Sequence, residues 1–313
     1  MRRVYNFLVR FKFFSLFVKL TQRIRLPGFE GLPLFDVTKF FFKGIYNGAI
    51  TTRASALAFT FFLALFPSII FLFTMIAYLP IKGFQDELLQ LIKDLLPDNA
   101  YKLAYSTIFD IIKHQLGGLL SIGFVASIYF STNGINALIN AFNKSHHYVE
   151  TRKPLQQYIV SLILVFAFAI MVIISISLIV FTEYLLHEMV HHGWIKTRSI
   201  VFSIKIGRWI IICALFFLVI SFLYYLGPAN KNNWRFVSAG STLATLLSLL
   251  TSILFTYYVN NFGNYNKVYG SIGTLIVILL WIYFNAVILL IGFELNASID
   301  NAKKIKLKSS VTE

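Results

Sequence analysis

The segment from His187 to His191 carries the sharpest match between residue spacing and a known chemistry. Its residues fit the pattern H-E-x-x-H, with Glu188 directly after the first histidine. On a helix this spacing places two imidazoles on one face as zinc ligands, with the glutamate as general base. Glu183 lies one turn earlier on the same face. The segment therefore makes a zinc-dependent membrane hydrolase one candidate function.

Two other interpretations of the histidine segment stay open. The segment ends at Gly193 with no obvious third ligand downstream, whereas a catalytic zinc site needs three protein ligands. The histidines could hold a structural or adventitious metal, or they could belong to an unliganded helix at the membrane surface. We expect no cofactor and keep His187, Glu188 and His191 only as candidate metal ligands.

Composition places this segment in a membrane protein. Of the 313 residues 58% are hydrophobic and only 13% are charged, and the mean hydropathy is +0.73. Because soluble domains carry about a quarter charged residues, this balance argues strongly against a water-soluble enzyme. The single cysteine, Cys213, lies in an apolar run, which argues against disulfides and CxxC redox chemistry.

Six runs are long and apolar enough to cross a hydrocarbon core about 30 Å thick, which requires about 20 helical residues. Continuous apolar runs of this length indicate helices, because helices satisfy their own backbone amides inside lipid. We therefore predict an all-α polytopic membrane protein with six transmembrane helices plus amphipathic interfacial helices. The predicted spans are residues 54–80, 118–142, 158–182, 207–227, 236–259 and 270–297.

The distribution of basic residues predicts the orientation of these spans. The two termini and the loops on their side hold nineteen Lys and Arg, against eight on the opposite side. The positive-inside rule then places both termini in the cytoplasm. The predicted regions are a cytoplasmic basic interfacial region at 1–53, a transmembrane domain at 54–297 and a cytoplasmic basic tail at 298–313. Since the net charge of +15 follows membrane sidedness, it implies no nucleic-acid partner.

Two segments outside the spans are predicted to lie on the membrane surface. Residues 1–25 combine an apolar helical face with many basic residues, which is typical of a helix on an anionic membrane. Residues 81–117 interleave leucine and isoleucine with acids, which predicts one or two amphipathic helices on the outer surface. We expect membrane lipids with anionic headgroups as partners, and the sequence identifies no protein partner.

Two stripes of polar residues follow predicted spans. In 118–142, asparagines recur in steps of three and four and so share one arc of the helix, at Asn133, Asn136 and Asn140, with Asn143 just beyond. In 236–259, hydroxyls share one face beside Gly240, at Ser238, Ser241, Thr245, Ser248, Ser252 and Thr256. Each stripe could hydrogen-bond between helices, or the two could face each other and line a polar slot for a lipid headgroup.

Glu294 is the only acid within a predicted transmembrane run. A carboxylate there is costly unless it is paired, protonated or hydrated. Arg53 and Arg235 begin spans on the side where the last span ends, so both are candidate partners. The sequence predicts a structural charge clamp between arginine and Glu294, with a proton relay as the alternative.

Several motif residues occur together: Pro67, Tyr265, Asn266, Lys267, Tyr269, Gly270, Trp281, Gly292 and Glu294. With their neighbours they resemble the YihY/BrkB family of bacterial inner-membrane proteins over roughly residues 37–300. The resemblance implies six helices with both termini cytoplasmic, in the bacterial inner membrane. The family once carried the label ribonuclease BN, its members are described as virulence factors, and lipid transport has been suggested for some relatives. It supplies no agreed catalytic residue and does not include the histidine segment.

The sequence favours a protein that transports or handles a lipid or lipid-like amphiphile through a polar slot between helices. A non-transporting membrane scaffold for envelope integrity is the second hypothesis, and the zinc-dependent hydrolase is the third. Acids are scattered and no RNA-binding module is visible, so the residues do not support the ribonuclease label. We predict from this that the chain is not an enzyme.

Overall fold

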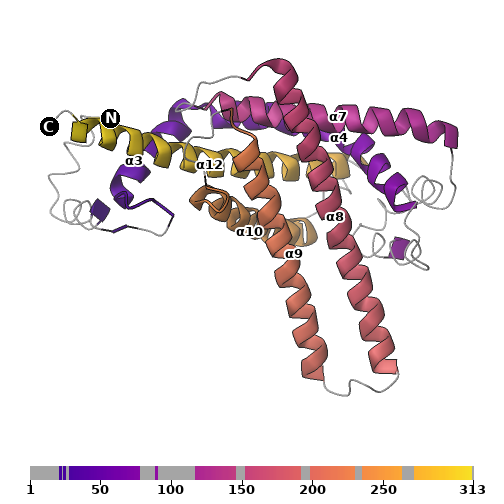
Figure 1. The fold of residues 1–313 in the computed structure, drawn as a ribbon. Helices are drawn as coiled ribbons and strands as arrows, with labels where there is room; N and C mark the ends of the chain where they lie inside the picture. Colours follow the sequence, from indigo (N-terminus) through magenta and orange to yellow (C-terminus); the bar gives the residue numbers. More distant parts are fainter. Residues whose placement is uncertain are drawn as a thin grey trace.

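The computed structural model describes residues 21–22, 24–25, 28–77, 89–90, 117–145, 152–191, 198–229, 235–262 and 271–311. Within these ranges the regular structure is entirely helical (Figure 1). Its main helices are α3 (Leu34–Asn47), α4 (Ile50–Ala77), α7 (Gly117–Asn143), α8 (Pro154–His191), α9 (Arg198–Leu226), α10 (Ala239–Phe262) and α12 (Ser271–Val311).

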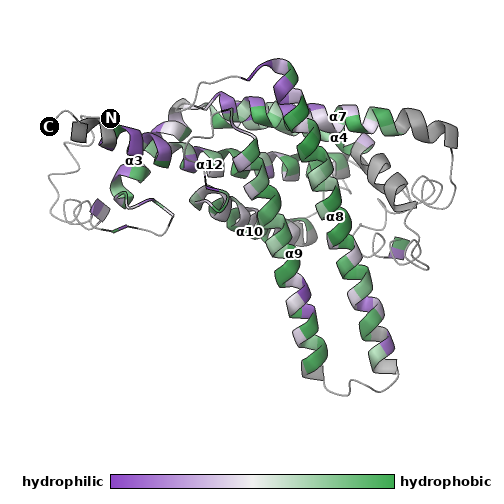
Figure 2. Cartoon of the chain, in the orientation of Figure 1, coloured by the Kyte–Doolittle hydropathy of each residue, from purple (hydrophilic) through white to green (hydrophobic). Residues whose placement is uncertain are grey.

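Five of these helices are long and apolar enough to cross a membrane: α4, α8, α9, α10 and α12. The prediction of an all-α, polytopic membrane protein is confirmed in this form. The predicted span 118–142 coincides with α7, but α7 is not among the five, so the predicted count of six is not reproduced. Hydrophobic residues cover most of these helices, whereas hydrophilic residues gather on α3 and towards the C-terminal end of α12 (Figure 2).

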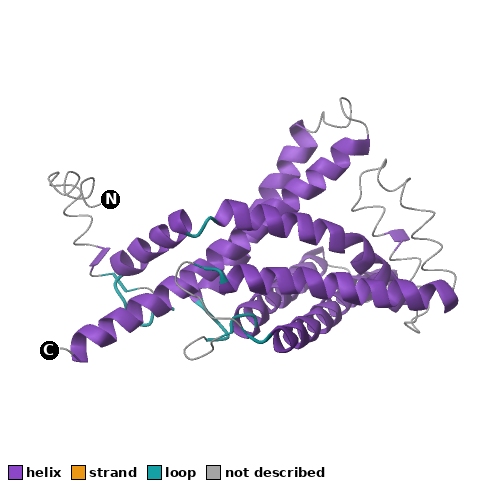
Figure 3. Ribbon diagram, turned by 90° about the horizontal axis from the view of Figure 1, so that it is seen from above, coloured by secondary structure: helices purple, strands orange, loops and turns teal. Residues whose placement is uncertain are grey.

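The helices pack in two groups. In the first group α4 packs on α7 and on α12, while α12 also contacts α10 and α3. In the second group α8 and α9 pack side by side as an antiparallel hairpin, which is steeply inclined to α4, α7 and α12 (Figure 1). The view from above shows α12 as one long helix that ends beside α3 (Figure 3). This arrangement brings α3 to the C-terminal half of α12, where Glu294, Asn296 and Ser298 are buried.

Several helix boundaries differ from the sequence prediction. Helix α4 continues through Pro67, and α8 extends beyond residue 182 to His191. Helix α12 extends through most of the predicted tail to Val311, and α3 is a separate helix within the predicted region 1–53. The surface helices predicted at 1–25 and 81–117 lie almost wholly outside the described residues, so those two predictions stay predictions.

Two apolar clusters hold these helices together, and the larger one includes residues of α9. In one, the rings of Phe142 and Phe293 stack with centroids 4.3 Å apart, and Tyr224 meets Phe142 edge-on at 5.6 Å. The Tyr224 hydroxyl donates a hydrogen bond to the Leu289 carbonyl oxygen at 2.6 Å. The other cluster packs the 28–32 turn and α3 onto the end of α12, through Phe29, Leu32, Val37, Leu295, Ile299 and Ala302. Between these clusters lies Glu294.

Candidate functional site: a buried ion pair, two polar contacts and an apolar cavity

Glu294 is fully buried on α12, and the structure brings it together with Arg53 of α4. The distance from Arg53 Nη2 to Glu294 Oε2 is 3.8 Å, and the side chains are 11% and 0% exposed. Arg53 Nη1 also donates a hydrogen bond to the Ala141 carbonyl oxygen of α7 at 2.8 Å. The arginine therefore links three helices that are distant in sequence.

Glycines allow α3 and the turn after it to close over this pair. A Cβ added to Gly44 would overlap Glu294 Oε1 and would lie 2.7 Å from Glu294 Cδ. A Cβ added to Gly48 would lie 2.9 Å from Arg53 Nη2. Ala49, which follows, has a φ of 47°, the left-handed conformation that turns the chain from α3 into α4. Small residues at these positions are therefore required for the ion pair to be covered.

Arg235, the second arginine predicted beside Glu294, has a different ion-pair partner. Its Nε lies 3.7 Å from Glu30 Oε1, and 71% of its side chain is exposed. Glu30 Oε2 in turn accepts a hydrogen bond from Lys303 Nζ of α12 at 2.5 Å. These residues attach the 28–31 turn to the ends of α10 and α12.

The asparagine stripe of α7 faces α8, where Gln157 binds it. Gln157 Nε2 donates to Asn136 Oδ1 at 2.6 Å and to Asn140 Oδ1 at 2.8 Å. Asn143 Nδ2 donates to Gln157 Oε1 at 3.4 Å. Asn133 lies on the same helix and is half-buried. Gln157 was not among the residues predicted from the sequence, although its place just before the next predicted span was an available signal.

The hydroxyl stripe of α10 is buried at Ser241, Thr245 and Ser248, and α10 packs on α12 and α9. At the start of α10, the Ser238 hydroxyl accepts a hydrogen bond from the Ser241 amide at 3.1 Å, as an N-cap does. Asn296 of α12 completes this end: its Oδ1 accepts from the Gly240 amide at 2.8 Å and its Nδ2 donates to Ser238 Oγ at 2.8 Å. The two polar stripes thus pack against different helices.

Close packing between α10 and α12 depends on two more glycines. A Cβ on Gly240 would overlap the Gly292 carbonyl oxygen, and a Cβ on Gly292 would lie 2.5 Å from Tyr224 Oη. Gly292 belongs to the family motif found in the sequence, together with Pro67 in α4 and Trp281 in α12. Glu294 of the ion pair belongs to the same motif, and its remaining residues, Tyr265, Asn266, Lys267, Tyr269 and Gly270, lie outside the described residues.

A cavity of about 380 Å³ lies between α4, α7, α8 and α12. Its walls are mainly apolar, with Phe61, Ala64, Val165, Phe168, Ala169 and Trp281 among them. Ser131 and Asn285 supply polar atoms, and the Asn285 amide donates to the Trp281 carbonyl oxygen at 2.9 Å. Neither predicted stripe contributes a residue to this cavity.

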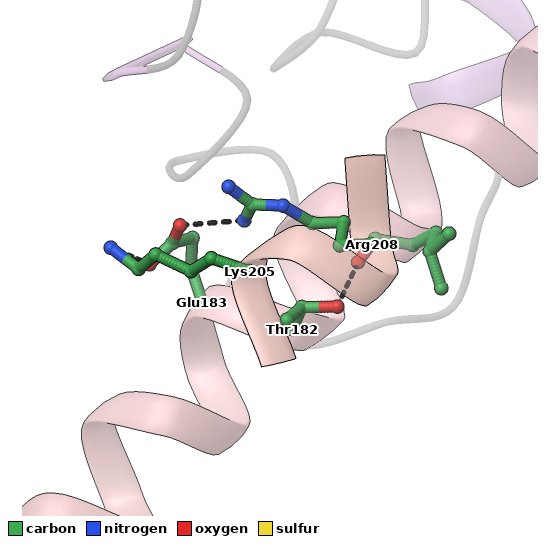
Figure 4. Close-up of polar contacts among 5 residues, drawn as sticks. Thr182, Glu183, Lys205 and Arg208 are labelled. Carbon is green, nitrogen blue, oxygen red and sulfur yellow. Dashed lines mark hydrogen bonds and ion pairs between the residues drawn. The ribbon is translucent and has the colours of Figure 1, made fainter. Parts of the chain in front are cut away.

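The histidine segment forms the last turns of α8, and the side chains of His187 and His191 lie outside what the structure describes. Glu183, one turn earlier, accepts a hydrogen bond from Arg208 Nη1 of α9 at 2.5 Å and lies 3.8 Å from Lys205 Nζ (Figure 4). The described residues contain no group of three or more His, Cys, Asp or Glu that could hold a metal ion.

The position of Glu183 contradicts the prediction that Glu294 is the only acid within a transmembrane run. It lies within the apolar stretch Pro154–Leu186 of α8, because this helix extends further than the predicted span. Glu294 is therefore not the only acid inside a candidate transmembrane helix.

Long apolar helices around a buried ion pair define this chain as a multi-pass membrane protein. A family model described as "Virulence factor BrkB" matches residues 41–312, and the chain belongs to this family. It is 31% identical to "Putative ribonuclease-like protein YfkH" of Bacillus subtilis, over 81% of this chain and 91% of the relative. It is 22% identical to "UPF0761 membrane protein NTHI0384" of Haemophilus influenzae, over 83% of this chain and 93% of the relative. No solved structure matches the chain.

The name of the Bacillus relative contradicts one prediction made from the sequence. We predicted that the chain is not an enzyme, whereas a relative that matches most of the chain is named ribonuclease-like. That prediction is withdrawn. The UPF0761 relatives are named only as membrane proteins, and these names establish no catalysis.

Proposed function

We propose that this protein binds and transfers a lipid or lipid-like amphiphile, with an acyl chain of the ligand in the cavity between α4, α7, α8 and α12. The observation that carries the proposal is the apolar cavity itself, whose volume of about 380 Å³ falls in the usual range for ligand sites. Four helices of a membrane protein surround it, so an acyl chain could enter directly from the bilayer. An apolar ligand also avoids the cost of desolvating polar groups.

The headgroup of this ligand is proposed to lie against the asparagine face of α7. Ser131 and Gly134 line the cavity, and Asn133, Asn136 and Asn140 continue along the same helix towards its C-terminal end. Asn140 is exposed, and its side-chain nitrogen still has donors available after its oxygen binds Gln157. We assign Ser241, Thr245 and Ser248 to helix packing, because they are buried in α10, which packs on α12 and α9.

We further propose that α7 is a sixth span and that both termini lie in the cytoplasm of a bacterial inner membrane. Helix α7 has 27 residues, and at 1.5 Å per residue this is longer than a hydrocarbon core of about 30 Å. The excess of basic residues on the side of the termini supports the orientation. An even number of spans is also what places both termini on one side.

The test uses a substitution that fills the cavity. Ala169 lines it from α8, whereas Ala167 on the same helix does not. We expect Ala169→Phe to reduce the lipid that full-length protein retains in mild detergent, measured by native mass spectrometry, and Ala167→Phe to retain it. Equal retention by both variants contradicts the proposal, and no retained lipid in the wild type would favour the scaffold hypothesis.

RNA hydrolysis is a second candidate, favoured by the name of the Bacillus subtilis relative, "Putative ribonuclease-like protein YfkH". It is tested by incubating the purified protein with labelled RNA and following cleavage on a gel. Cleavage by this preparation, absent from a mock purification of cells that lack the protein, would establish the activity. Cleavage of equal rate in both preparations would assign it to a contaminant.

A further inference from the structure

A second, polar cavity lies where the 28–31 turn meets the start of α10 and the C-terminal part of α12. Its volume is about 60 Å³, and its lining includes Glu30, Arg235, Ser238, Asn296 and Asp300. The turn reaches this position because three of its residues adopt a positive φ: 91° at Gly28, 52° at Glu30 and 75° at Gly31. Gly28 also allows close approach to α10, since a Cβ there would lie 3.4 Å from the Ala239 Cβ.

The polar groups in this cavity leave one buried acceptor unsatisfied. Asp300 Oδ2 lies 2.8 Å from Lys304 Nζ, but Asp300 Oδ1 is buried and has no hydrogen-bond partner among the described residues. Asn296 Nδ2 donates one hydrogen to Ser238 Oγ, and no hydrogen bond joins its amide to Asp300 Oδ1. Buried acceptors in native proteins are nearly always satisfied, and a space of this size holds about four waters or one small ligand group.

Charge divides the cavity into an acidic interior and a basic rim. Glu30 and Asp300 supply carboxylates whose side chains are only 14% and 12% exposed, and each also pairs with a lysine outside the lining, Lys303 or Lys304. Arg235 lies at the rim, largely exposed, with its Nε 3.7 Å from Glu30. Val237 adds an exposed apolar side chain to the same lining. A ligand with an ammonium group inward and a phosphate outward would complement both parts.

We infer that this cavity binds a primary ammonium group attached to a phosphate, which is the chemistry of an ethanolamine headgroup. The ammonium donates to Asp300 Oδ1 and is neutralised by Asp300 and Glu30, while the phosphate pairs with Arg235. A choline headgroup fails because its nitrogen carries no hydrogen to donate. The inference is independent of the proposed function, since it concerns neither the apolar cavity nor the asparagine face.

The test compares lipids that differ only in their headgroup. Full-length protein in mild detergent receives phosphatidylethanolamine, phosphatidylcholine and phosphatidylglycerol with identical acyl chains, and native mass spectrometry measures what is retained. We expect about tenfold more phosphatidylethanolamine than phosphatidylcholine, as for a hydrogen bond to a charged group. Free phosphoethanolamine added to the same sample distinguishes a soluble ligand, which displaces the lipid at low concentration, from a lipid that needs its acyl chains. Both outcomes support the ammonium site.

Two variants locate the preference in the cavity. Asp300→Asn removes the charge at nearly constant volume. Val237→Trp blocks the cavity from an exposed position and leaves every charged residue unchanged. Both are expected to lose the preference, whereas Asp36→Asn, which changes an acid of α3 outside the cavity, keeps it. If the cavity holds only water, the three lipids are retained equally, and this result overturns the inference. Preference for phosphatidylglycerol, or a preference that survives in both variants, overturns it as well.

Discussion

Arg53 Nη2 lies 3.8 Å from Glu294 Oε2, and this contact joins two residues that are far apart in the sequence, one at the start of α4 and one in α12. The pair is covered by α3 through Gly44, stands beside the Phe142–Phe293 stack, and is tied to α7 by the Ala141 carbonyl. A buried ion pair contributes little net stability, but each charge requires the other to remain buried. The consequences of removing one or both charges therefore differ.

Removing either charge alone is expected to destabilise the protein strongly. Glu294→Gln leaves the Arg53 guanidinium buried without its counter-charge, and Arg53→Met leaves the carboxylate, at a cost of about 3–5 kcal/mol each. The double variant should recover much of this loss. The measurement is the yield of monodisperse protein and its melting temperature in detergent. Lys205→Met is the control, because the side chains of its ion pair with Glu183 are 46% and 47% exposed. Normal yield with lost lipid transfer in Glu294→Gln would instead favour a proton relay.

Methyl groups added at the helix crossings are expected to prevent close packing. Gly292→Ala would place a Cβ 2.5 Å from Tyr224 Oη and 2.8 Å from the Ala244 Cβ. Overpacking of this kind costs about 1–3 kcal/mol, which should lower the melting temperature. Gly207→Ala in α9 is the matched control, because a Cβ there meets nothing within 4 Å, and alanine favours helix by about 1 kcal/mol. Equal melting temperatures for the two variants would contradict the packing described.

Gln157 is expected to matter more than its neighbour Gln156. Gln157→Leu removes two hydrogen bonds to asparagine oxygens of α7, and interhelical bonds in membranes average about 0.6 kcal/mol each. Gln156 is exposed, so Gln156→Leu should leave the melting temperature almost unchanged. If Gln157→Leu retains full stability but loses lipid transfer, the amides serve the ligand and not helix packing.

The helices were predictable because their signal lies within each segment. Runs of apolar residues specify a membrane helix without any knowledge of its neighbours, so five predicted spans correspond to helices that can cross a membrane. Helix ends were less predictable. Glu183 lies beyond the end of the predicted span 158–182, yet it is within the apolar stretch of α8 and pairs with Arg208 of α9.

The partners of polar residues could not be read from one helix at a time. The sequence proposed Arg53 and Arg235 equally as partners of Glu294, and only packing separates them, since the 28–31 turn places Glu30 beside Arg235. Likewise the two polar stripes could be recognised in the sequence, but the helices against which they pack could not. Gln157 lies in a segment without any stripe, and only its place just before the predicted span 158–182 was a signal. Nothing around Asn296 in the sequence indicated its contact with the start of α10.

The ion pair between α8 and α9 is expected to stabilise the outer part of the hairpin. The Arg208 side chain is 9% exposed and Glu183 is its acceptor, whereas Lys205 is 46% exposed. Glu183→Gln therefore leaves a buried guanidinium with a weaker acceptor, and protection of α8 and α9 amides from hydrogen exchange should decrease. Lys205→Met removes only an exposed charge, worth at most about 1 kcal/mol. Identical exchange in the two variants would show that the hairpin does not depend on the pair.

The number of spans decides on which side of the membrane the two termini lie. If α7 crosses, Lys113 and Lys144 lie on opposite faces of the membrane, and the six spans place both termini on the same side. If α7 does not cross, the five remaining spans place the termini on opposite sides.

Cysteine labelling distinguishes these two topologies. Cysteines introduced at positions 113 and 144 in a Cys213→Ser background can be labelled with a membrane-impermeant maleimide, because Cys213 is the only native cysteine. We expect Lys113→Cys to react in cells whose outer face is accessible and Lys144→Cys to react only in inverted vesicles, since basic residues accumulate on the cytoplasmic face. Labelling of both positions from the same side would exclude α7 as a span and leave the chain with five.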